Sequence, residues 1–312
     1  MFHGMEYVYE VYKEKSFSQA AHNLFISQPS LSAAVKKVEE KIGYPIFDRS
    51  TKPLALTECG KEYIRAAEGI LSIQADFSNY LTDLGTLKSG TLILGGSSLF
   101  SSWILPKLME KFHQEYPLVK LSLIEENTIQ LEQLLQNGSI DIILDNSILN
   151  SSSLSSRIYQ EEHLILAVPE SFAINKELKE YQISVSQIRS GEFRKEDILS
   201  VPLDRFSKEP FVLLKPENDT RKRALTICRL HGFVPKTIFE MDQQQTAYYV
   251  TCSGFGISFV SDTLISKGAE IPGVVYYKLP GEHSRRNLLF YWKRERYFSK
   301  AMEEFLRISL EA

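Results

Sequence analysis

Cysteine and histidine are scarce in this sequence and scattered along it. The three cysteines, Cys59, Cys228 and Cys252, are too few and too far apart for a disulfide framework or a zinc site, and we expect inert thiols. The six histidines show no metal-binding spacing such as His-Glu-x-x-His. These absences exclude a disulfide-rich secreted domain, and we expect neither a bound metal nor a cofactor.

Motifs for nucleophilic catalysis and for phosphate binding are also missing. The serine-rich turn at residues 96–100 lacks the second glycine of a nucleophile elbow. No glycine-rich loop is followed by Lys-Ser or Lys-Thr. We therefore expect that the chain is not an enzyme.

Long apolar runs and an excess of positive charge are lacking as well. No apolar run approaches the ~20 residues that cross a membrane, and residues 1–6 lack the charged-then-apolar pattern of an export signal. We therefore expect a cytoplasmic protein with no membrane partner. The net charge of −3 excludes a protein that coats nucleic acid with a globally basic surface, so any affinity for DNA must come from local charge.

Residues 17–49 predict two short helices that meet at a tight turn. Ser27 is a favourable N-cap for the second helix, and Pro29 lies in its first turn, where a proline costs no hydrogen bond. The inward stripe of this helix recurs at spacings of four, three and four residues, as expected for packing on the preceding helix. It consists of Leu31, Val35, Val38 and Ile42.

The opposite stripe of the second helix carries short polar side chains first and lysines later. In a helix-turn-helix, the start of the second helix reads base edges, and cations further along contact phosphates. An ordinary helical hairpin with a solvated polar face would have the same periodicity, so the pattern alone leaves both interpretations open. The candidate DNA-binding residues are Ser27, Gln28, Pro29, Ser30, Ser32, Ala33, Lys36 and Lys37.

The order and spacing of several short motifs favour the helix-turn-helix. These motifs are Ser16-Phe17, Ala20-Ala21, Leu24, residues 27–32 (SQPSLS), Val38-Glu39, Ile42-Gly43, Phe47-Asp48-Arg49 and residues 56–60 (LTECG). Over this stretch the chain resembles the LysR-type transcriptional regulators. The resemblance implies a winged helix-turn-helix, a long dimerising helix and a two-lobed sensor of small molecules, with dimers that pair into tetramers. RNA polymerase is a further candidate partner of such a regulator.

One departure from the family pattern concerns base reading. Many members carry Arg, Gln or His directly after the Leu-Ser of the second helix, whereas this chain has Ala33 and Ala34. We therefore expect base reading to depend on Gln28, Ser30 and Ser32.

Residues 46–56 predict a short two-stranded wing after the second helix. Arg49 and Lys52 lie where a wing meets phosphate or the minor groove, and simple solvation of the loop is the alternative. We take residues 1–58 as the DNA-binding domain. They hold seven basic and seven acidic side chains, so this domain is neutral and should bind DNA weakly on its own.

Residues 59–88 predict a long linker helix that begins after the cap residue Thr57. Apolar residues recur along it in strict alternation of three and four, which is typical of the seam of a two-helix coiled coil. Packing on its own domain is the alternative. Two DNA-binding domains on one coiled coil would gain affinity because the second contact becomes intramolecular. The candidate dimerisation residues are Tyr63, Ala66, Ile70, Ile73, Phe77, Tyr80, Leu84 and Leu87.

Residues 89–312 change to alternating strand and helix patterns, which predict parallel sheets covered by helices. The chain crosses between two such units, and this arrangement resembles a periplasmic-binding-protein sensor. We expect lobe 1 at about 89–163 and 269–312 and lobe 2 at about 164–268, with the strands at 274–278 and 287–292 returning to lobe 1. The other expected strands are 91–95, 119–124, 141–144, 164–169, 211–214, 237–240 and 257–260, and the expected helices are 102–115, 128–137, 220–231, 244–252 and 299–310.

Residues 170–210 exceed the short connection that the resemblance leads us to expect between two strands. Within them, residues 175–181 and 193–199 predict added helical turns. Such an elaboration could cover the cleft between the lobes.

Polar residues follow the ends of several predicted strands, at the starts of helices. Ligands of open α/β sheets bind beyond the carboxyl ends of strands, where helix starts present free N–H groups. Such groups favour an anionic or highly polar small ligand, although each residue could serve only as a helix cap. The candidate effector-binding residues are Ser97, Ser98, Ser101, Asn127, Thr128, Pro216, Asn218, Asp219 and Thr220.

These observations predict a DNA-binding transcriptional regulator that responds to a small molecule. The expected fold class is α plus α/β, with an N-terminal winged helix-turn-helix, a long coiled-coil linker helix and a two-lobed, periplasmic-binding-protein-like effector domain. The expected partners are double-stranded DNA, a small effector and a second copy of the chain. The alternative is an orphan DNA-binding regulator whose sensor domain is vestigial and binds no ligand.

Overall fold

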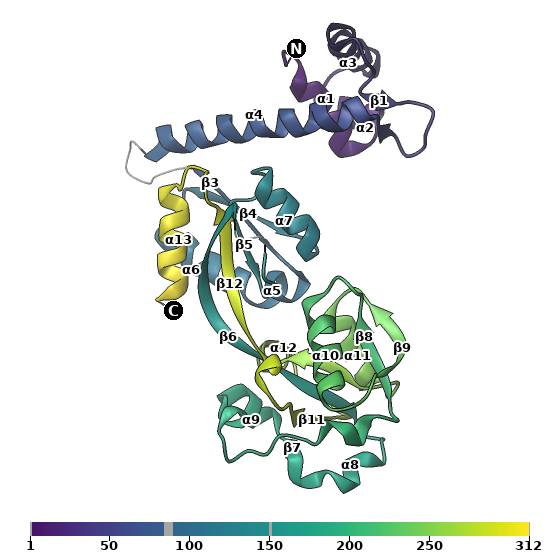
Figure 1. Cartoon of the computed structure of the whole chain (residues 1–312). Helices are drawn as coiled ribbons and strands as arrows, with labels where there is room; N and C mark the ends of the chain where they lie inside the picture. The colour runs from purple at the N-terminus through teal and green to yellow at the C-terminus, as the bar shows by residue number, and fades with distance from the viewer. Residues whose placement is uncertain (1, 84–89, 150–151, 312) are drawn as a thin grey trace. The chain divides into compact units, whose positions relative to one another are not determined.

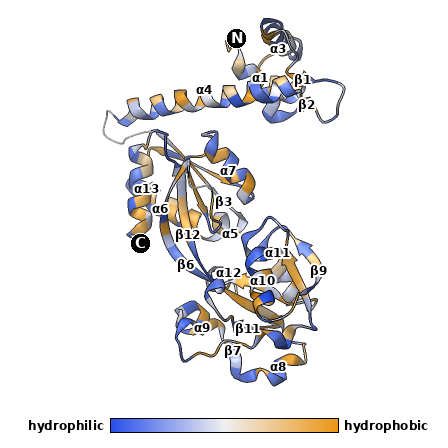
Figure 2. Ribbon diagram, in the orientation of Figure 1, coloured by the Kyte–Doolittle hydropathy of each residue, from blue (hydrophilic) through white to orange (hydrophobic). Residues whose placement is uncertain are grey.

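The computed structural model describes residues 2–83, 90–149 and 152–311. The chain forms two compact units, an N-terminal unit that ends with helix α4 (Glu58–Asp83) and a C-terminal unit that begins with strand β3 (Gly90–Gly96). Each unit has its own hydrophobic core. Apolar residues recur along α4 (Figure 2), and those near its start, such as Tyr63 and Ile64, belong to the core of the N-terminal unit.

Capped helices form the helix-turn-helix that residues 17–49 predict. The Ser27 hydroxyl accepts a hydrogen bond from the Ser30 N–H at 3.2 Å, which begins the second helix. Gly43 ends this helix at φ 83°, a left-handed conformation that glycine adopts without strain. Three residues of the predicted inward stripe are buried and the fourth is half-buried. The helices are α1 (Met5–Glu14), α2 (Phe17–Asn23) and α3 (Gln28–Ile42).

The wing consists of two short antiparallel strands, β1 (Phe47–Asp48) and β2 (Ala55–Leu56). Thr57 then caps α4, since its Oγ1 accepts a hydrogen bond from the Gly60 N–H at 2.9 Å. A Cβ atom at Gly60 would lie 2.1 Å from the carbonyl oxygen of Ile46. The close packing of α4 on the wing therefore requires glycine at this position.

Lobe 1 of the C-terminal unit is a mixed sheet with helices on its faces (Figure 1). Besides β3, its elements are β4 (Val119–Glu125), β5 (Ile142–Asp145), β6 (Leu154–Pro169), β12 (Arg285–Lys293), α5 (Ser98–Trp103), α6 (Leu105–Glu115), α7 (Thr128–Gln136) and α13 (Lys300–Leu310). The strand order is β4-β3-β5-β12-β6. The first three strands are mutually parallel, and β12 runs antiparallel to both of its neighbours. The carboxyl ends of β3, β4 and β5 therefore meet at one edge of the lobe.

The helix predicted at residues 102–115 is present as α6, but it begins at Leu105, and a separate helix, α5, precedes it. α5 ends at Trp103 and α6 begins at Leu105, with Ile104 between them at φ −108° and ψ −61°. Pro106 has no N–H to donate to the carbonyl of Ser102, and in a continuous helix its ring would clash with that carbonyl. The proline therefore forces a new helix start.

Lobe 2 continues the same sheet along the far half of β6. Its strands and main helices are β7 (Gln182–Ile183), β8 (Pro210–Leu214), β9 (Lys236–Met241), β10 (Ser258–Ser261), β11 (Val274–Lys278), α10 (Asp219–Leu230), α11 (Gln244–Cys252) and α12 (Asp262–Lys267). β10 and β11 pair antiparallel with β6, and β8 pairs in parallel with β9. β6 and β12 run side by side from one lobe to the other (Figure 1).

β11 belongs to lobe 2, so the prediction that residues 274–278 return to lobe 1 was wrong. Val274 pairs with Pro169 and Lys278 pairs with Ile165, both in the half of β6 that lies in lobe 2. The side chain of Tyr277 is buried in the core of this lobe. The chain therefore returns to lobe 1 with β12, about ten residues later than expected.

Residues 170–210 pack at the far end of lobe 2, away from lobe 1 (Figure 1). β7 adds to the sheet beside β11, and Phe193 and Phe206 are buried in the cores. No described residue of this segment lines the cleft between the lobes. The expectation that the segment covers the cleft was therefore wrong, because its apolar residues pack into the hydrophobic cores instead. Its helical turns are α8 (Ile174–Glu177), α9 (Val185–Ser190) and the 3-10 turns Lys179–Tyr181, Glu192–Arg194 and Leu203–Phe206.

Candidate functional site

The outer face of α3 presents the side chains that were predicted to contact DNA. The Ser27 and Ser30 hydroxyl oxygens lie 2.7 Å apart, so both groups take part in the helix cap. Gln28 beside them is the longest exposed polar side chain at the start of the helix. Lys36 pairs with Glu40 at 3.7 Å, and both side chains remain largely in solvent. The exposed candidates are Ser27, Gln28, Pro29, Ser30, Ala33, Lys36 and Lys37, whereas Ser32 is half-buried.

Arg49 of the wing is held against α3 by Glu39, a residue that the sequence patterns did not single out for a role. Glu39 Oε2 accepts a hydrogen bond from Arg49 Nη2 at 3.0 Å, while Oε1 accepts the N–H groups of Ile46 and Phe47 at 2.8 and 3.3 Å. The Arg49 guanidinium also lies over the ring of Phe17 at 5.1 Å. Arg49 therefore fastens the wing to the helix, with 46% of its side chain still exposed. Lys52 is exposed in the loop between β1 and β2.

The predicted dimerisation residues fall into two groups along α4. Tyr63 is buried in the core of its own unit and stacks on Phe2 with ring centroids 5.3 Å apart. The prediction that Tyr63 contacts a second helix was therefore wrong. Further along, Ile73 is 70% exposed and Phe77 is 61% exposed. The exposed stripe comprises Ala66, Ile73, Phe77 and Tyr80, with Ile70 half-buried, whereas Leu84 and Leu87 lie outside the described residues.

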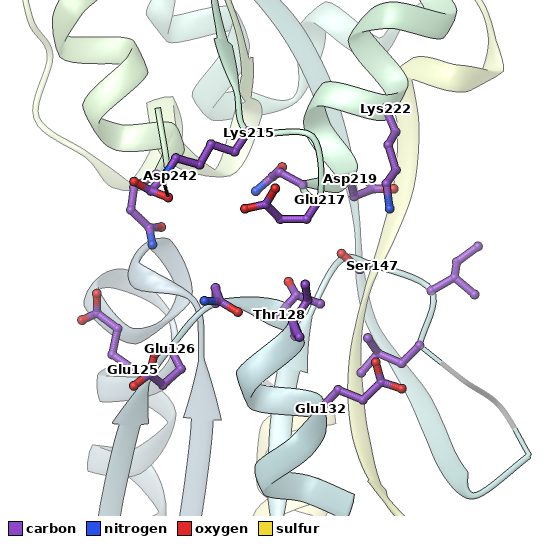
Figure 3. A pocket seen from close by; sticks show the side chains of 16 residues that line it. Glu125, Glu126, Thr128, Glu132, Ser147, Lys215, Glu217, Asp219, Lys222 and Asp242 are labelled. Atoms are coloured by element: carbon purple, nitrogen blue, oxygen red, sulfur yellow. Dashed lines mark ion pairs between the residues drawn. The ribbon is translucent and has the colours of Figure 1, made fainter. Parts of the chain in front are cut away.

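An open cavity of about 620 Å³ lies between the two lobes of the C-terminal unit. One wall is formed by the carboxyl end of β4 and the start of α7, and the other by the loops that follow β8 and β9. Figure 3 shows side chains from both walls directed into the space between them. Four of the predicted effector-binding residues line this outer cavity, namely Asn127, Thr128, Asn218 and Asp219.

Carboxylates outnumber ammonium groups on the walls of the outer cavity. Lys215 pairs with Asp242 at 2.6 Å (Figure 3), and Lys222 is the other lysine of the lining. Asp219 is bonded to two arginines. The acidic residues of the lining are Glu125, Glu126, Glu132, Glu217, Asp219 and Asp242. The cavity therefore carries a net negative lining.

A smaller pocket of about 40 Å³ adjoins the outer cavity and shares Thr128, Asn218 and Gln243 with it. Three more predicted residues line this inner pocket, Ser97, Ser98 and Thr220. The pocket is lined by the starts of α5, α7, α10 and α11, and no described lysine, arginine or histidine lines it. The inner pocket therefore offers hydrogen bonds rather than compensating positive side chains.

Asp145 is the buried acid of the inner pocket, at the carboxyl end of β5. One carboxylate oxygen accepts the Thr128 hydroxyl at 2.9 Å, and the other accepts the Ser147 N–H at 2.7 Å. Burial raises the pKa of Asp145, and the hydrogen bonds from Ser147 and Thr128 oppose that rise. This carboxyl group therefore fixes the start of α7 in the cleft.

Two predicted effector residues do not line either cavity. Ser101 is buried, and its hydroxyl donates to the Gly96 carbonyl at 2.9 Å, which is a structural contact. Pro216 is exposed in the loop before α10. The structure instead adds Asp145, Asn146 and residues 243–245 to the inner pocket. The run of three glutamines at the start of the predicted helix 244–252 was the signal in the sequence that could have identified this last group.

Two classes of feature are missing from the described part of the chain. No helix there is long and apolar enough to span a membrane. Among the same residues, no group of three or more His, Cys, Asp or Glu side chains is arranged to hold a metal ion.

Family models match both units of the chain. Residues 85–312 match the LysR substrate binding domain. Residues 2–61 match the helix-turn-helix of bacterial regulatory proteins of the lysR family. Together these matches include the helix-turn-helix face and all the residues that line the cleft.

Similar proteins span nearly the whole chain. An uncharacterized HTH-type transcriptional regulator of Bacillus subtilis (strain 168), YcgK, is 28% identical over 99% of this chain and 93% of its own length. A probable RuBisCO transcriptional regulator of Porphyra purpurea is 28% identical over 94% of this chain and 88% of its own. Among solved structures, full-length OxyR from Pseudomonas aeruginosa, a variant, has a TM-score of 0.69 at 19% identity and covers 99% of this chain and 92% of its own. Full-length CbnR complexed with its target DNA has a TM-score of 0.67 at 18% identity, covering 99% and 98%.

Proposed function

The chain belongs to the LysR family of DNA-binding transcriptional regulators, and from this premise we propose that its cleft binds a small polar effector that carries a positively charged group. Members of this family are regulators and not enzymes, so the cleft binds its ligand without converting it. A hydrogen-bonding group of the effector occupies the inner pocket. Its cationic group lies among the carboxylates of the outer cavity, and its binding changes how the chain engages DNA.

The net charge of the outer cavity carries this proposal. Asp219 is bonded to two arginines and Asp242 to Lys215. The lining holds four further carboxylates and one further lysine, and this excess of negative charge disfavours an anionic ligand. Two unit charges 4 Å apart interact by about 1 kcal/mol in water and by about 4 kcal/mol at an effective dielectric constant of ~20. The expectation of an anionic or polar effector is thereby narrowed to a polar one with an amine or a similar cation. A carboxylate on the same molecule can still bind at the helix starts of the inner pocket.

For the DNA step, we propose that α3 enters the major groove with Gln28 at base edges and with Lys36 and Lys37 at phosphates. Ser27, Pro29, Ser30, Ser32 and Ala33 form the rest of this face, and Arg49 and Lys52 of the wing contact the backbone. Because chromosomal DNA is the target, we also propose a cytoplasmic location. Pairing of dimers into tetramers and contact with RNA polymerase remain predictions of the family resemblance.

A second copy of the chain is the proposed partner of α4. Ile73, Phe77 and Tyr80 recur at spacings of four and three, as in a coiled-coil seam, and together expose a large apolar stripe. A lone surface helix with such a stripe would favour association. Replacing Phe77 by Glu should convert a dimer to a monomer in analytical ultracentrifugation, whereas Gln74→Glu, at an exposed position off the seam, should not.

A thermal-shift panel of charge-matched compounds tests the effector class. We expect diamines and amino acids such as putrescine and L-lysine to raise the melting temperature of the full chain more than the dicarboxylates succinate and glutarate. A ligand at 100 times its dissociation constant stabilises the folded state by about 2.7 kcal/mol. Stabilisation by the dicarboxylates alone would overturn the proposal. A flat response to the whole panel would instead favour the vestigial sensor, which the open cavity of about 620 Å³ argues against.

A further inference from the structure

An ion pair is buried between the two strands that connect the lobes. Glu162 of β6 and Arg286 of β12 are cross-strand partners, with Arg286 Nε donating to Glu162 Oε2 at 2.7 Å. The exposed fractions of the two side chains are 0% and 1%. Neither group lines the cleft itself. Stability alone does not explain such a pair, because a buried ion pair is often no more stabilising than apolar side chains of similar volume.

The pair is bonded to cleft residues of both lobes. On the side of lobe 1, Asn146 Nδ2 donates to Glu162 Oε2 at 3.2 Å. On the side of lobe 2, Arg286 Nη1 donates to Asp219 Oδ2 at 3.1 Å and to Thr220 Oγ1 at 2.9 Å. Asn146 and Thr220 line the inner pocket, and Asp219 lines the outer cavity. A ligand in the cleft therefore contacts groups that are already bonded to this pair.

The network is incomplete in the observed arrangement of the lobes. Glu162 Oε1 is buried and accepts no hydrogen bond within the described part of the chain. A buried acceptor without a partner disfavours the arrangement that leaves it so. The Nη2 group of Arg286 is likewise buried without a hydrogen bond of good geometry, although it lies 2.7 Å from Glu162 Oε2.

We propose that Arg286 is a positioning residue of the effector cleft. Arg286 holds Asp219 and Thr220 of lobe 2, and it is itself held by Glu162, which is bonded to Asn146 of lobe 1. The positions of Asp219 and Thr220 therefore depend on Asn146. This inference rests on the proposed function of the cleft as an effector site. Ligand bonds to Asn146 or Thr220 alter their bonds to the pair. Because the pair lies on the two strands that connect the lobes, the change in bonding becomes a change in the angle between them. Arg286 acts in this way without touching the ligand.

The distance between the lobes in the full chain tests this role without needing a ligand. Spin labels are placed at Gln133 of α7 and Lys236 of β9, both exposed, in a background where the three native cysteines are alanine. Dilution with unlabelled chain removes distances between copies. Pulsed electron paramagnetic resonance then reports the distribution of distances between the lobes. We expect one narrow distribution for the chain with the pair intact.

The decisive variant replaces both charges, as Glu162→Met with Arg286→Met, because removing one alone leaves a buried unpaired charge that can prevent folding. The matched control is Arg221→Met. Arg221 lies on α10 like the partners of Arg286, but it binds Glu240 at 2.5 Å and the Leu214 carbonyl at 2.8 Å, both within lobe 2. Melting temperatures of all variants separate a loss of stability from a change of lobe angle.

The proposal expects the double variant to stay folded and to give a distance distribution at least twice as wide as that of the control, or one with a shifted maximum. A double variant with the distribution of the intact chain would overturn it, and the pair would then be purely structural. A compound that stabilises the intact chain in the thermal-shift panel supplies a second arm. It should shift the distance in the intact chain and in Arg221→Met but leave the double variant unmoved, and an equal shift in all three would also overturn the proposal. If no compound of the thermal-shift panel stabilises the chain, the distance measurement without ligand still decides whether the pair sets the lobe angle.

Discussion

Two glutamate–arginine pairs, one in each unit, join segments that meet only in the folded chain. Arg49 and Glu39 fasten the wing to α3 at 3.0 Å, with 46% of the arginine side chain in solvent. Arg286 and Glu162 join β12 to β6 at 2.7 Å, with almost nothing exposed. The chemistry is the same, and the surroundings differ. The difference teaches that a pair with a half-exposed arginine can be altered to change the charge of a surface, whereas a fully buried pair acts as a unit.

Removal of one buried partner should have the largest effect on stability. Arg286→Met leaves the Glu162 carboxylate buried and unpaired, so we expect the free energy of unfolding of the C-terminal unit to fall by about 3–5 kcal/mol. The double replacement Glu162→Met with Arg286→Met should recover most of this loss. Urea denaturation followed by circular dichroism measures both. Equal losses in the single and double variants would mean that the pair does not act as a unit.

Acid should weaken the C-terminal unit through His163, which follows Glu162 on β6. Burial lowers the pKa of His163 to about 4, with Arg194 and Arg285 adding to the effect and Glu161 opposing it. Since the unfolded chain binds this proton near pH 6.5, stability is complete above that pH and falls by up to roughly 3 kcal/mol as the pH drops to 4.

His163→Gln removes this titration and should flatten the dependence of the melting temperature on pH between 6.5 and 4. His113→Gln is the matched control, because His113 is an exposed residue of α6 in the same unit. An equal flattening in both variants, or in neither, would show that another group causes the acid sensitivity.

On the surface of the N-terminal unit, Gln28 should control base preference without affecting stability. Gln28→Ala removes the one long exposed polar side chain at the start of α3, and we expect discrimination at one base pair to fall by about 1–3 kcal/mol. Selection from random DNA before and after the change gives the preference at each position. Unchanged preference, with the melting temperature also unchanged, would mean that the reading face has been assigned wrongly.

Loss of the half-exposed pair should have only a small effect on stability but should strengthen DNA binding. Glu39→Gln keeps an acceptor for the Ile46 N–H but removes the charge that holds Arg49, so we expect a stability loss below about 1 kcal/mol. Affinity for DNA should rise severalfold with a steeper salt dependence, because Arg49 is released toward phosphate. Fluorescence anisotropy at several salt concentrations measures this, and Glu40→Gln is the control. Weaker binding by Glu39→Gln would show that Arg49 must stay clamped to α3.

The N-terminal unit could be predicted closely because its determinants are local. Ser27 begins α3 and Gly43 ends it through contacts within a few residues, and the inward stripe follows from helical spacing. Tyr63 shows the limit of such patterns. An apolar residue at a seam position also suits the core of its own unit, and periodicity alone does not distinguish the two. The interruption between α5 and α6 at Ile104 could have been predicted from Pro106.

The cleft could be predicted only in part because its residues come from distant strands. Helix starts after strands identified Thr128 and Thr220, yet Glu162 and Arg286 are separated by 124 residues and carry no local signal. The lobe of β11 depends on its pairing with β6, which spacing along the sequence does not encode. The charge of the cavity likewise emerges only when both walls are assembled.

The most direct test of the central claim is whether occupancy of the cleft changes the affinity for DNA. A fluorescent duplex obtained by selection from random DNA is titrated with the full chain, with and without a compound that stabilises the chain in the thermal-shift panel. Gln243→Trp serves as the blocked cleft, because Gln243 lines both cavities and has no side-chain cap bond. We predict that the compound changes the dissociation constant by about fivefold or more in the intact chain and leaves Gln243→Trp unchanged. A stabilising compound that leaves DNA affinity unchanged, or that still changes it in Gln243→Trp, would contradict the account.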